Sequence, residues 1–246
     1  MQYFGILETK YEELFVTSSF MYFNREDETI TAKELKQLIK TNKDRKRNIA
    51  GTIFLYNPEE TPTGYKMSRF LQNDGFDKYD EYITLNENPR AYILNAGLKK
   101  HYKGKLVEIK YLFSYNRENI EPTPILEEFD ADLDKLTSTQ LTRYDRDLNY
   151  LDVANVRLTG KFVFLGFGNK FDRHHKAIIS YARALSSQVH KLDKNVVFIH
   201  DNNYDAQECR EIGYFLSPFA TGKMREVRAN AFKKVFATEL PEIIKL

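Results

Sequence analysis

Short apolar runs that alternate with segments of helical periodicity constrain the fold of this chain more than any other feature. The four clearest runs are IAGTIFLY from residue 49, LVEIKYLFSYN from residue 106, KFVFLGFG from residue 161 and NVVFIHD from residue 195. Segments with apolar residues at helical spacing lie between and after them, as in HHKAIISYARALSSQVHKL and KMREVRANAFKKVFATEL. Strands that alternate with helices are typical of an α/β fold with a mainly parallel sheet covered by helices on both faces.

The N-terminal region predicts further strands and a helix. Alternating residues at Glu13–Thr17 and Ser19–Phe23 indicate two strands, with a hairpin as one arrangement. Thr31 followed by Glu34 has the pattern of a capping box and predicts a helix over AKELKQLIKTN, ended by the basic stretch NKDRKRN. Without a repeat or a linker, the chain is predicted to form a single α/β domain, 1–246, with 1–48 as an extension and 49–246 as the core.

Composition sets bounds on location and partners. The 37 basic and 35 acidic residues give a net charge of +2, which neither demands nor excludes a polyanionic partner. The single cysteine, Cys209, rules out an internal disulfide framework and fits a reducing compartment. The first residues lack the basic and apolar regions of a signal peptide, and no apolar stretch reaches the length of a membrane helix. We therefore expect a cytoplasmic protein with no membrane association.

Polar residues follow three of the predicted strands, in FLYNPEE, FLGFGNKFD and FIHDNNYD. Because the carboxyl ends of parallel strands meet at one edge of a sheet, these residues are expected to gather where α/β proteins bind ligands. A turn at Asn57-Pro58 is the simpler interpretation of the first motif. The gathered residues would be Asn57, Glu59, Glu60, Asn169, Asp172, His200, Asp201, Asn202 and Asn203.

Several common chemistries are disfavoured. GFGN at 166–169 is not a dinucleotide fingerprint, because Phe171 stands where the third glycine would be. Asp172 with His174 and His175 suggests a metal site only weakly, since adjacent histidines on a helix point to different faces. No nucleophile elbow, P-loop or H-E-x-x-H motif is present. We expect neither a metal nor a cofactor.

Basic residues cluster late in the chain, at the start of a predicted helix that follows FLSPFATG. Lys223, Arg225 and Arg228 flank its apolar face. A solvated helix face is the ordinary interpretation of such charges. A basic helix N-terminus is also suited to binding phosphate, which would make nucleic acid a partner.

The order of these motifs resembles the uracil-DNA glycosylase superfamily, and most closely a bacterial and phage family of unknown function within it. The signature of that family is an apolar strand running into Asn-Pro-Ser-Thr-Ala-Asp, then Asn-Leu-Phe-Ala-Tyr-Arg, then Ala-Trp-Gly. This chain has Tyr56-Asn57-Pro58-Glu59-Glu60, Tyr111-Leu112-Phe113-Ser114-Tyr115-Asn116 and Gly166-Phe167-Gly168. The resemblance covers about residues 49 to 225 and implies a mainly parallel four-stranded sheet in an α/β/α sandwich that grips a flipped nucleotide at its strand ends.

The resemblance also implies roles for individual residues. Asn57 would position the water that attacks the sugar carbon, aided by Glu59 or Glu60, and His200 would stabilise the departing base. Tyr111 stands at the position of the base-reading asparagine, and the remaining candidates for base binding are Tyr65, Phe167, Asn169 and Asn202. Two departures from the pattern are Asp201-Asn202 after His200, where the superfamily has Pro-Ser, and Glu59-Glu60 in place of Ser-Thr.

These observations lead to three hypotheses of different classes. The first is a nucleobase-releasing hydrolase that acts on a modified or non-canonical base in nucleic acid, most simply DNA, after flipping it out of the helix. The second is a non-catalytic nucleotide- or protein-binding module on the same scaffold, of the kind used in phage–host conflict. The third is a small-molecule α/β enzyme with an acid cluster formed by Glu59, Glu60 and Asp172.

Overall fold

A computed structural model gives the fold of the chain. The structure describes residues 1–10, 13–25, 28–56, 82–85, 89–112, 153, 155–168, 176–192, 195–220 and 222–246.

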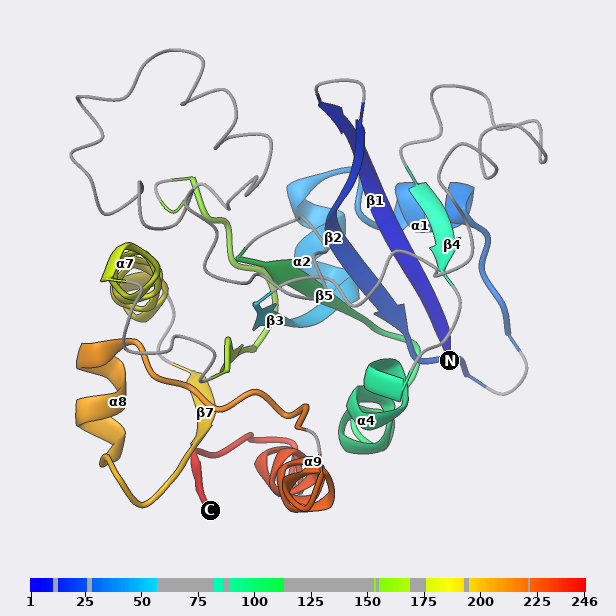
Figure 1. The fold of residues 1–246 in the computed structure, drawn as a ribbon. Helices are drawn as coiled ribbons and strands as arrows, with labels where there is room; N and C mark the ends of the chain where they lie inside the picture. Colours follow the sequence, from blue (N-terminus) through cyan, green and yellow to red (C-terminus); the bar gives the residue numbers. More distant parts are fainter. Residues whose placement is uncertain are drawn as a thin grey trace, which may run out of the picture.

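The described strands form one eight-stranded sheet in the order β4-β1-β2-β5-β3-β6-β7-β8 (Figure 1). The strands are β1 (Gln2–Lys10), β2 (Glu13–Tyr22), β3 (Ile49–Leu55), β4 (Tyr82–Leu85), β5 (Leu106–Tyr111), β6 (Phe162–Gly166), β7 (Val196–His200) and β8 (Ile244–Lys245). The helices that the structure describes are α1 (Ala32–Leu38), α2 (Asn42–Asn48), α4 (Pro89–Leu98), α7 (Lys176–Leu192), α8 (Ala206–Ile212) and α9 (Met224–Val235).

The sheet has a parallel half and an antiparallel half. Strands β5, β3, β6 and β7 are mutually parallel and include the four runs on which the α/β prediction rests. Strands β4, β1 and β2 continue the sheet beyond β5 with antiparallel pairing. The α/β class is confirmed, whereas the sheet is larger than four strands because the N-terminal hairpin pairs with β5 and the short β8 joins β7.

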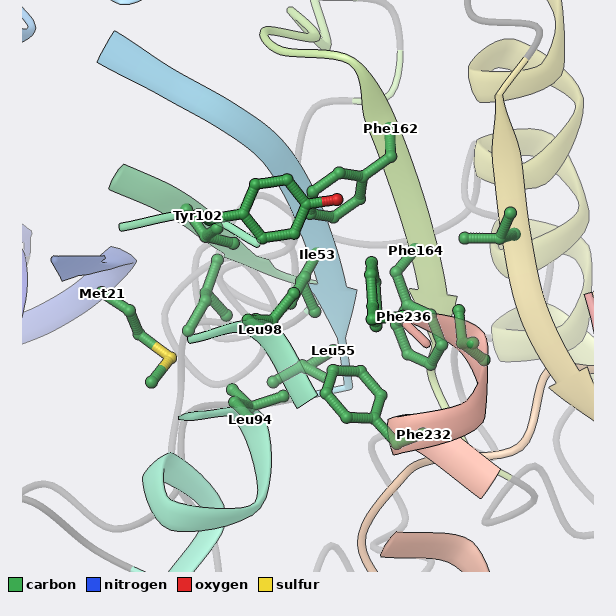
Figure 2. Packing of buried hydrophobic residues seen from close by; sticks show 14 of the residues in the cluster. Met21, Ile53, Leu55, Leu94, Leu98, Tyr102, Phe162, Phe164, Phe232 and Phe236 are labelled. Carbon is green, nitrogen blue, oxygen red and sulfur yellow. The ribbon is translucent and has the colours of Figure 1, made fainter. Parts of the chain in front are cut away.

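Helices α4 and α9 cover one face of the sheet, and Figure 2 shows the core beneath them. The ring of Phe232 on α9 packs edge-on against Phe164 of β6, with centroids 5.0 Å apart. Phe236, just after α9, packs in the same way against Phe162, at 4.9 Å. Because a buried phenylalanine contributes roughly 1.5–3 kcal/mol, these contacts firmly fix α9 to the sheet.

The opposite face of the sheet carries two further clusters. Phe54, Val163, Leu165 and Phe198 pack with residues of α7 and α8, and Phe4, Phe20 and Leu106 pack with Leu35 of α1. Helices therefore cover both faces, as the alternation of strands and helices predicted. Among the described helices, none is both long and apolar enough to cross a membrane.

The N-terminal region differs from its prediction in two respects. The capping box of Thr31 and Glu34 is confirmed, but NKDRKRN forms a second helix, α2, with its own capping box of Thr41 and Asp44. The two predicted strands, Glu13–Thr17 and Ser19–Phe23, are one strand, β2, that pairs with β1. The register passes from Ser18 to Val16 across that pairing, so a bulge at Thr17 interrupts the alternation that had suggested two strands.

Helix α8 was not predicted, although its start carries a recognisable signal. The Asp205 carboxylate accepts from the Glu208 amide and caps the helix, and the Glu208 carboxylate accepts from the Asp205 amide, which completes a capping box. Gly213 ends the helix in the left-handed conformation, with a φ of 73°. Seven residues are too few for apolar residues at helical spacing to reveal a helix.

The junction between α7 and α8 makes stability depend on pH. His190 Nδ1 donates to the Ser186 carbonyl over 2.7 Å, and burial, reinforced by the charge of Arg210, lowers the pKa of His190 below its ordinary value. The unfolded chain therefore binds a proton at a higher pH than the folded chain does. The contribution of the neutral His190 ring to the free energy of unfolding is fully present above about pH 6.5. It is lost as the pH falls through the lowered pKa of the folded state.

We expect the free energy of unfolding to fall between about pH 7 and pH 5, and we expect His190→Asn to reduce that fall. Asparagine retains a donor for the Ser186 carbonyl but cannot titrate. Urea unfolding of both proteins across this range measures the difference. Identical pH profiles for the two proteins would contradict the assignment.

Candidate active site at the carboxyl edge of the parallel strands

The carboxyl ends of β3, β6 and β7 lie along one edge of the sheet. Leu55, the last residue of β3, pairs with Gly166, the last residue of β6, and β7 ends next to it at His200. Adjacent strands are about 4.8 Å apart, so the ends of β3 and β7 are separated by roughly 9.5 Å. The ends of β3 and β7 therefore lie on opposite sides of β6 along this edge.

His200 is the one predicted catalytic residue that the structure describes. Its side chain is buried, with 6% exposed, and its ring packs against that of Phe198 with centroids 6.2 Å apart. Nδ1 lies 3.1 Å from the carbonyl oxygen of Asp201 and 3.1 Å from that of Tyr204. The turn after β7 thus holds the ring in one orientation.

The segment that follows α8 passes over the same edge. The Leu216 amide donates to the Ile199 carbonyl over 2.9 Å, and the Gly168 amide donates to the Phe215 carbonyl over 2.8 Å. Gly166 allows this approach, because a Cβ there would lie 2.6 Å from the Phe164 ring and 3.1 Å from Pro218. Residues 217–220 follow this edge, and α9 begins at Met224.

The predicted phosphate-binding residues lie at the start of α9. Lys223 and Arg225 are exposed, and Arg228 is half-buried. On the neighbouring α4, the Arg90 guanidinium lies over the ring of Phe219, 5.1 Å from its centroid. The N-terminal ends of α4 and α9 therefore lie near each other, together with Arg90, Lys223 and Arg225. Helix N-termini and positive side chains favour the binding of anions.

Two of the predicted base-binding residues are buried on opposite faces of the sheet. The Tyr111 hydroxyl lies 2.9 Å from that of Tyr3 and 2.8 Å from Ser19 Oγ, and burial raises its pKa well above the ordinary value. Phe167 packs edge-on against Phe54 and Phe215 in the cluster beneath α7 and α8. The structure therefore does not bring Tyr111 and Phe167 together around one ligand.

The other predicted site residues divide into two groups. Asn202 is exposed in the turn after β7, beside His200 in sequence. The rest lie outside the part of the chain that the structure describes, and their roles stay predictions: Asn57, Glu59, Glu60, Tyr65, Asn169, Asp172, His174 and His175.

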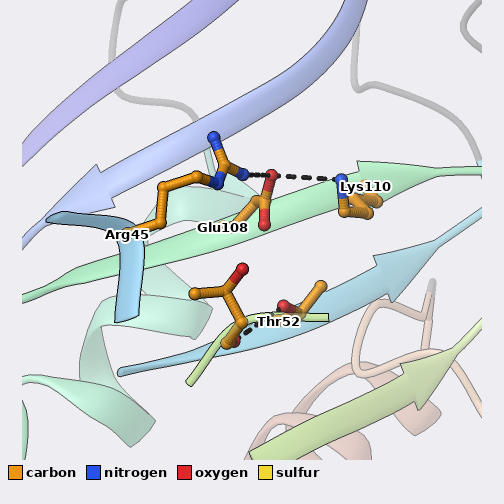
Figure 3. Close-up of polar contacts among 5 residues, drawn as sticks. Arg45, Thr52, Glu108 and Lys110 are labelled. Carbon is orange, nitrogen blue, oxygen red and sulfur yellow. Dashed lines mark hydrogen bonds and ion pairs between the residues drawn. The ribbon is translucent and has the colours of Figure 1, made fainter. Parts of the chain in front are cut away.

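A buried charged cluster on β5 was missed in the sequence (Figure 3). Glu108 has only 2% of its side chain exposed, and its Oε1 accepts from Arg45 at 2.5 Å and from Lys110 at 3.1 Å. Glu108 Oε2 is buried and has no hydrogen-bond partner in the structure. The available signal was the alternation in LVEIKY, which places Glu108 and Lys110 on the same side of a strand in the middle of the sheet.

The single cysteine of the chain lies on α8. Cys209 is buried, and burial, with help from nearby carboxylates, raises the pKa of its thiol to about 11. Among the residues that the structure describes, no three histidine, cysteine or acidic side chains are grouped so as to hold a metal ion.

Comparison with known proteins adds no assignment: no family model, curated protein or solved structure matches this chain.

Proposed function

We propose that the chain is a nucleobase-releasing hydrolase that acts on a modified or non-canonical base in DNA. The observation that carries this proposal is the placement of the motif-bearing strands. The four mutually parallel strands are those on which the glycosylase resemblance rests, and the carboxyl ends of β3 and β7 lie at one edge of the sheet. The resemblance implies a mainly parallel four-stranded sheet, and the proposal is supported by four mutually parallel strands within the eight-stranded sheet.

The proposed site divides the reaction among three groups. Asn57, two residues beyond the end of β3, would orient the attacking water, with Glu59 or Glu60 assisting. His200, at the end of β7, would contact the base. Lys223 and Arg225 at the start of α9 would hold backbone phosphate and offset the few kcal/mol that flipping a base costs.

The test is release of free base. The purified protein is incubated with DNA that carries a panel of normal, deaminated, alkylated and phage-type modified bases, and mass spectrometry detects the released base. We expect the wild type to release at least one base and Asn57→Ala to slow that release by about 100-fold or more, the usual loss when acid–base positioning is removed. DNA binding with no base released from any substrate would reject the proposal.

A non-catalytic binding module is the second candidate, and the burial of Tyr111 and Phe167 favours it. Both rings had been expected to hold the base, and both are 1% exposed. In this candidate Lys223 and Arg225 at the start of α9 contact phosphate, and Asn57 after β3 takes part in no reaction. It predicts DNA or nucleotide binding that Asn57→Ala leaves unchanged.

A further inference from the structure

The two carbonyl contacts of His200 fix the location of its ring hydrogen. Nδ1 faces the carbonyl oxygens of Asp201 and Tyr204, both at 3.1 Å. Because a carbonyl oxygen can only accept a hydrogen bond, Nδ1 must be the donor to both. In the neutral ring the other nitrogen, Nε2, then carries no hydrogen and presents a lone pair.

The turn that supplies these carbonyls is held by side chains around it. Asp201 Oδ1 accepts from the Asn203 amide at 2.9 Å, and Oδ2 accepts from the Tyr214 hydroxyl at 3.2 Å. The Asn203 side-chain amide also donates to Oδ2, at 3.2 Å. The far end of the turn runs directly into Asp205, which caps α8. The carbonyl positions thus depend on the Asp201 carboxylate and on the hydroxyl that binds it.

We propose that Asp201 and Tyr214 are positioning residues that fix the hydrogen of His200 on Nδ1, so that Nε2 accepts a hydrogen bond and selects a ligand with an N–H donor. The identity of that ligand rests on the proposed function, within which it is a nucleobase with an exocyclic amino group. An oxo group at the same place would direct its own lone pairs at Nε2 and leave that acceptor unsatisfied.

His200 then has a different role from the one that the resemblance implies. A neutral ring held in this way offers no hydrogen to a departing base, so only the doubly protonated ring could stabilise it as the resemblance implies. In this role His200 recognises the base, and negative charge that develops on the base must be met by other groups.

Nitrogen NMR of the full-length protein tests the tautomer without reference to activity. We expect protonated Nδ1 and unprotonated Nε2 in the neutral ring of His200, assigned with His200→Asn. Tyr214→Phe removes the hydroxyl that binds Asp201 but keeps the ring, and it should shift population toward the other tautomer. Tyr204→Phe is the matched control, because that hydroxyl makes no described hydrogen bond and the 204 carbonyl remains; it should leave the signals unchanged. Hydrogen on Nε2 in the wild type, or an unshifted tautomer in Tyr214→Phe, would overturn the proposal.

Paired substrates test the selection. DNA containing 5-methylcytosine is compared with DNA containing thymine, and 5-hydroxymethylcytosine with 5-hydroxymethyluracil, so that an amino group is exchanged for an oxo group. We expect release to be about tenfold or more faster for the amino member, and Tyr214→Phe to slow that release about threefold to tenfold, the loss expected for one hydrogen bond. His200→Asn retains a donor for the two carbonyls but lacks Nε2, and should abolish the preference.

The two proposals fail in distinguishable ways. Faster release of the oxo members would overturn the selection by Nε2 while leaving base release established. No release of any base, together with the expected NMR signals, would reject the proposed function while supporting the fixed tautomer.

Discussion

Replacing Arg45 with methionine is expected to lower the free energy of unfolding by about 3 kcal/mol, near the lower end of what losing one partner of a buried ion pair costs. Arg45 reaches from α2 to Oε1 of Glu108, a carboxylate in the middle of the sheet with only 2% of its side chain exposed. Lys110 remains on the same oxygen in the variant, which keeps the loss from being larger. The other oxygen, Oε2, has no hydrogen-bond partner, so no further donor stabilises the carboxylate when Arg45 is removed.

A double-mutant cycle separates this charge effect from lost packing. In a Glu108→Leu background the buried carboxylate is gone, and Arg45→Met is expected to cost less than about 1 kcal/mol, which gives a coupling of about 2 kcal/mol. Urea unfolding of the four proteins measures it. Equal costs in the two backgrounds would show that Arg45 contributes through packing alone.

The second large effect is expected at Gly160, just before β6. Gly160 has a φ of 100°, and a Cβ there would lie 2.4 Å from both the carbonyl carbon and the carbonyl oxygen of Ala50. The Lys161 amide donates to that same carbonyl over 2.6 Å, which holds the two backbones together. Neither backbone segment can move away without breaking the hydrogen bond at the start of β6. Gly160→Ala should therefore lower the free energy of unfolding by about 3 kcal/mol or more.

Gly222 provides the matched control for this substitution. It also has a positive φ, 58°, but a Cβ there meets no atom within 4 Å. Gly222→Ala should therefore cost only the conformational penalty, about 1 kcal/mol. Thermal and urea unfolding compare the two variants, and similar losses at both positions would show that the close approach at Gly160 does not matter.

The strands were predictable where a single physical signal dominates. IAGTIFLY, KFVFLGFG and NVVFIHD are buried on both sides of a parallel sheet, so they read as continuous apolar runs bounded by polar residues. The position of the N-terminal hairpin in the same sheet was not predictable, because its pairing with β5 joins residues far apart in sequence. Helix α8 escaped detection because a capping box, rather than an apolar face, marks it.

The site was predictable only in part, for a related reason. Strand order placed His200 at a carboxyl edge, as the position of a polar residue after an apolar run suggested. Sequence could not give the direction in which each side chain points. Tyr111 faces the cluster beneath α4 and α9, whereas Phe167 faces the cluster beneath α7 and α8, and this depends on register and on how the chain leaves each strand. The carbonyls that hold His200 come from a turn whose geometry no motif encodes.

The most direct test of the central claim asks whether the residues after β3 and β7 act on one reaction. Base release is measured under single-turnover conditions for the wild type, Asn57→Ala, His200→Asn and the double variant, with unfolding curves to confirm that each is folded. We expect Asn57→Ala to lose about 100-fold or more and His200→Asn, which removes one recognition hydrogen bond, about tenfold. The double variant should lose little beyond the larger single loss, because groups that act as a unit are not additive. Wild-type release rates in either single variant, or no release by the wild type on any substrate, would contradict it.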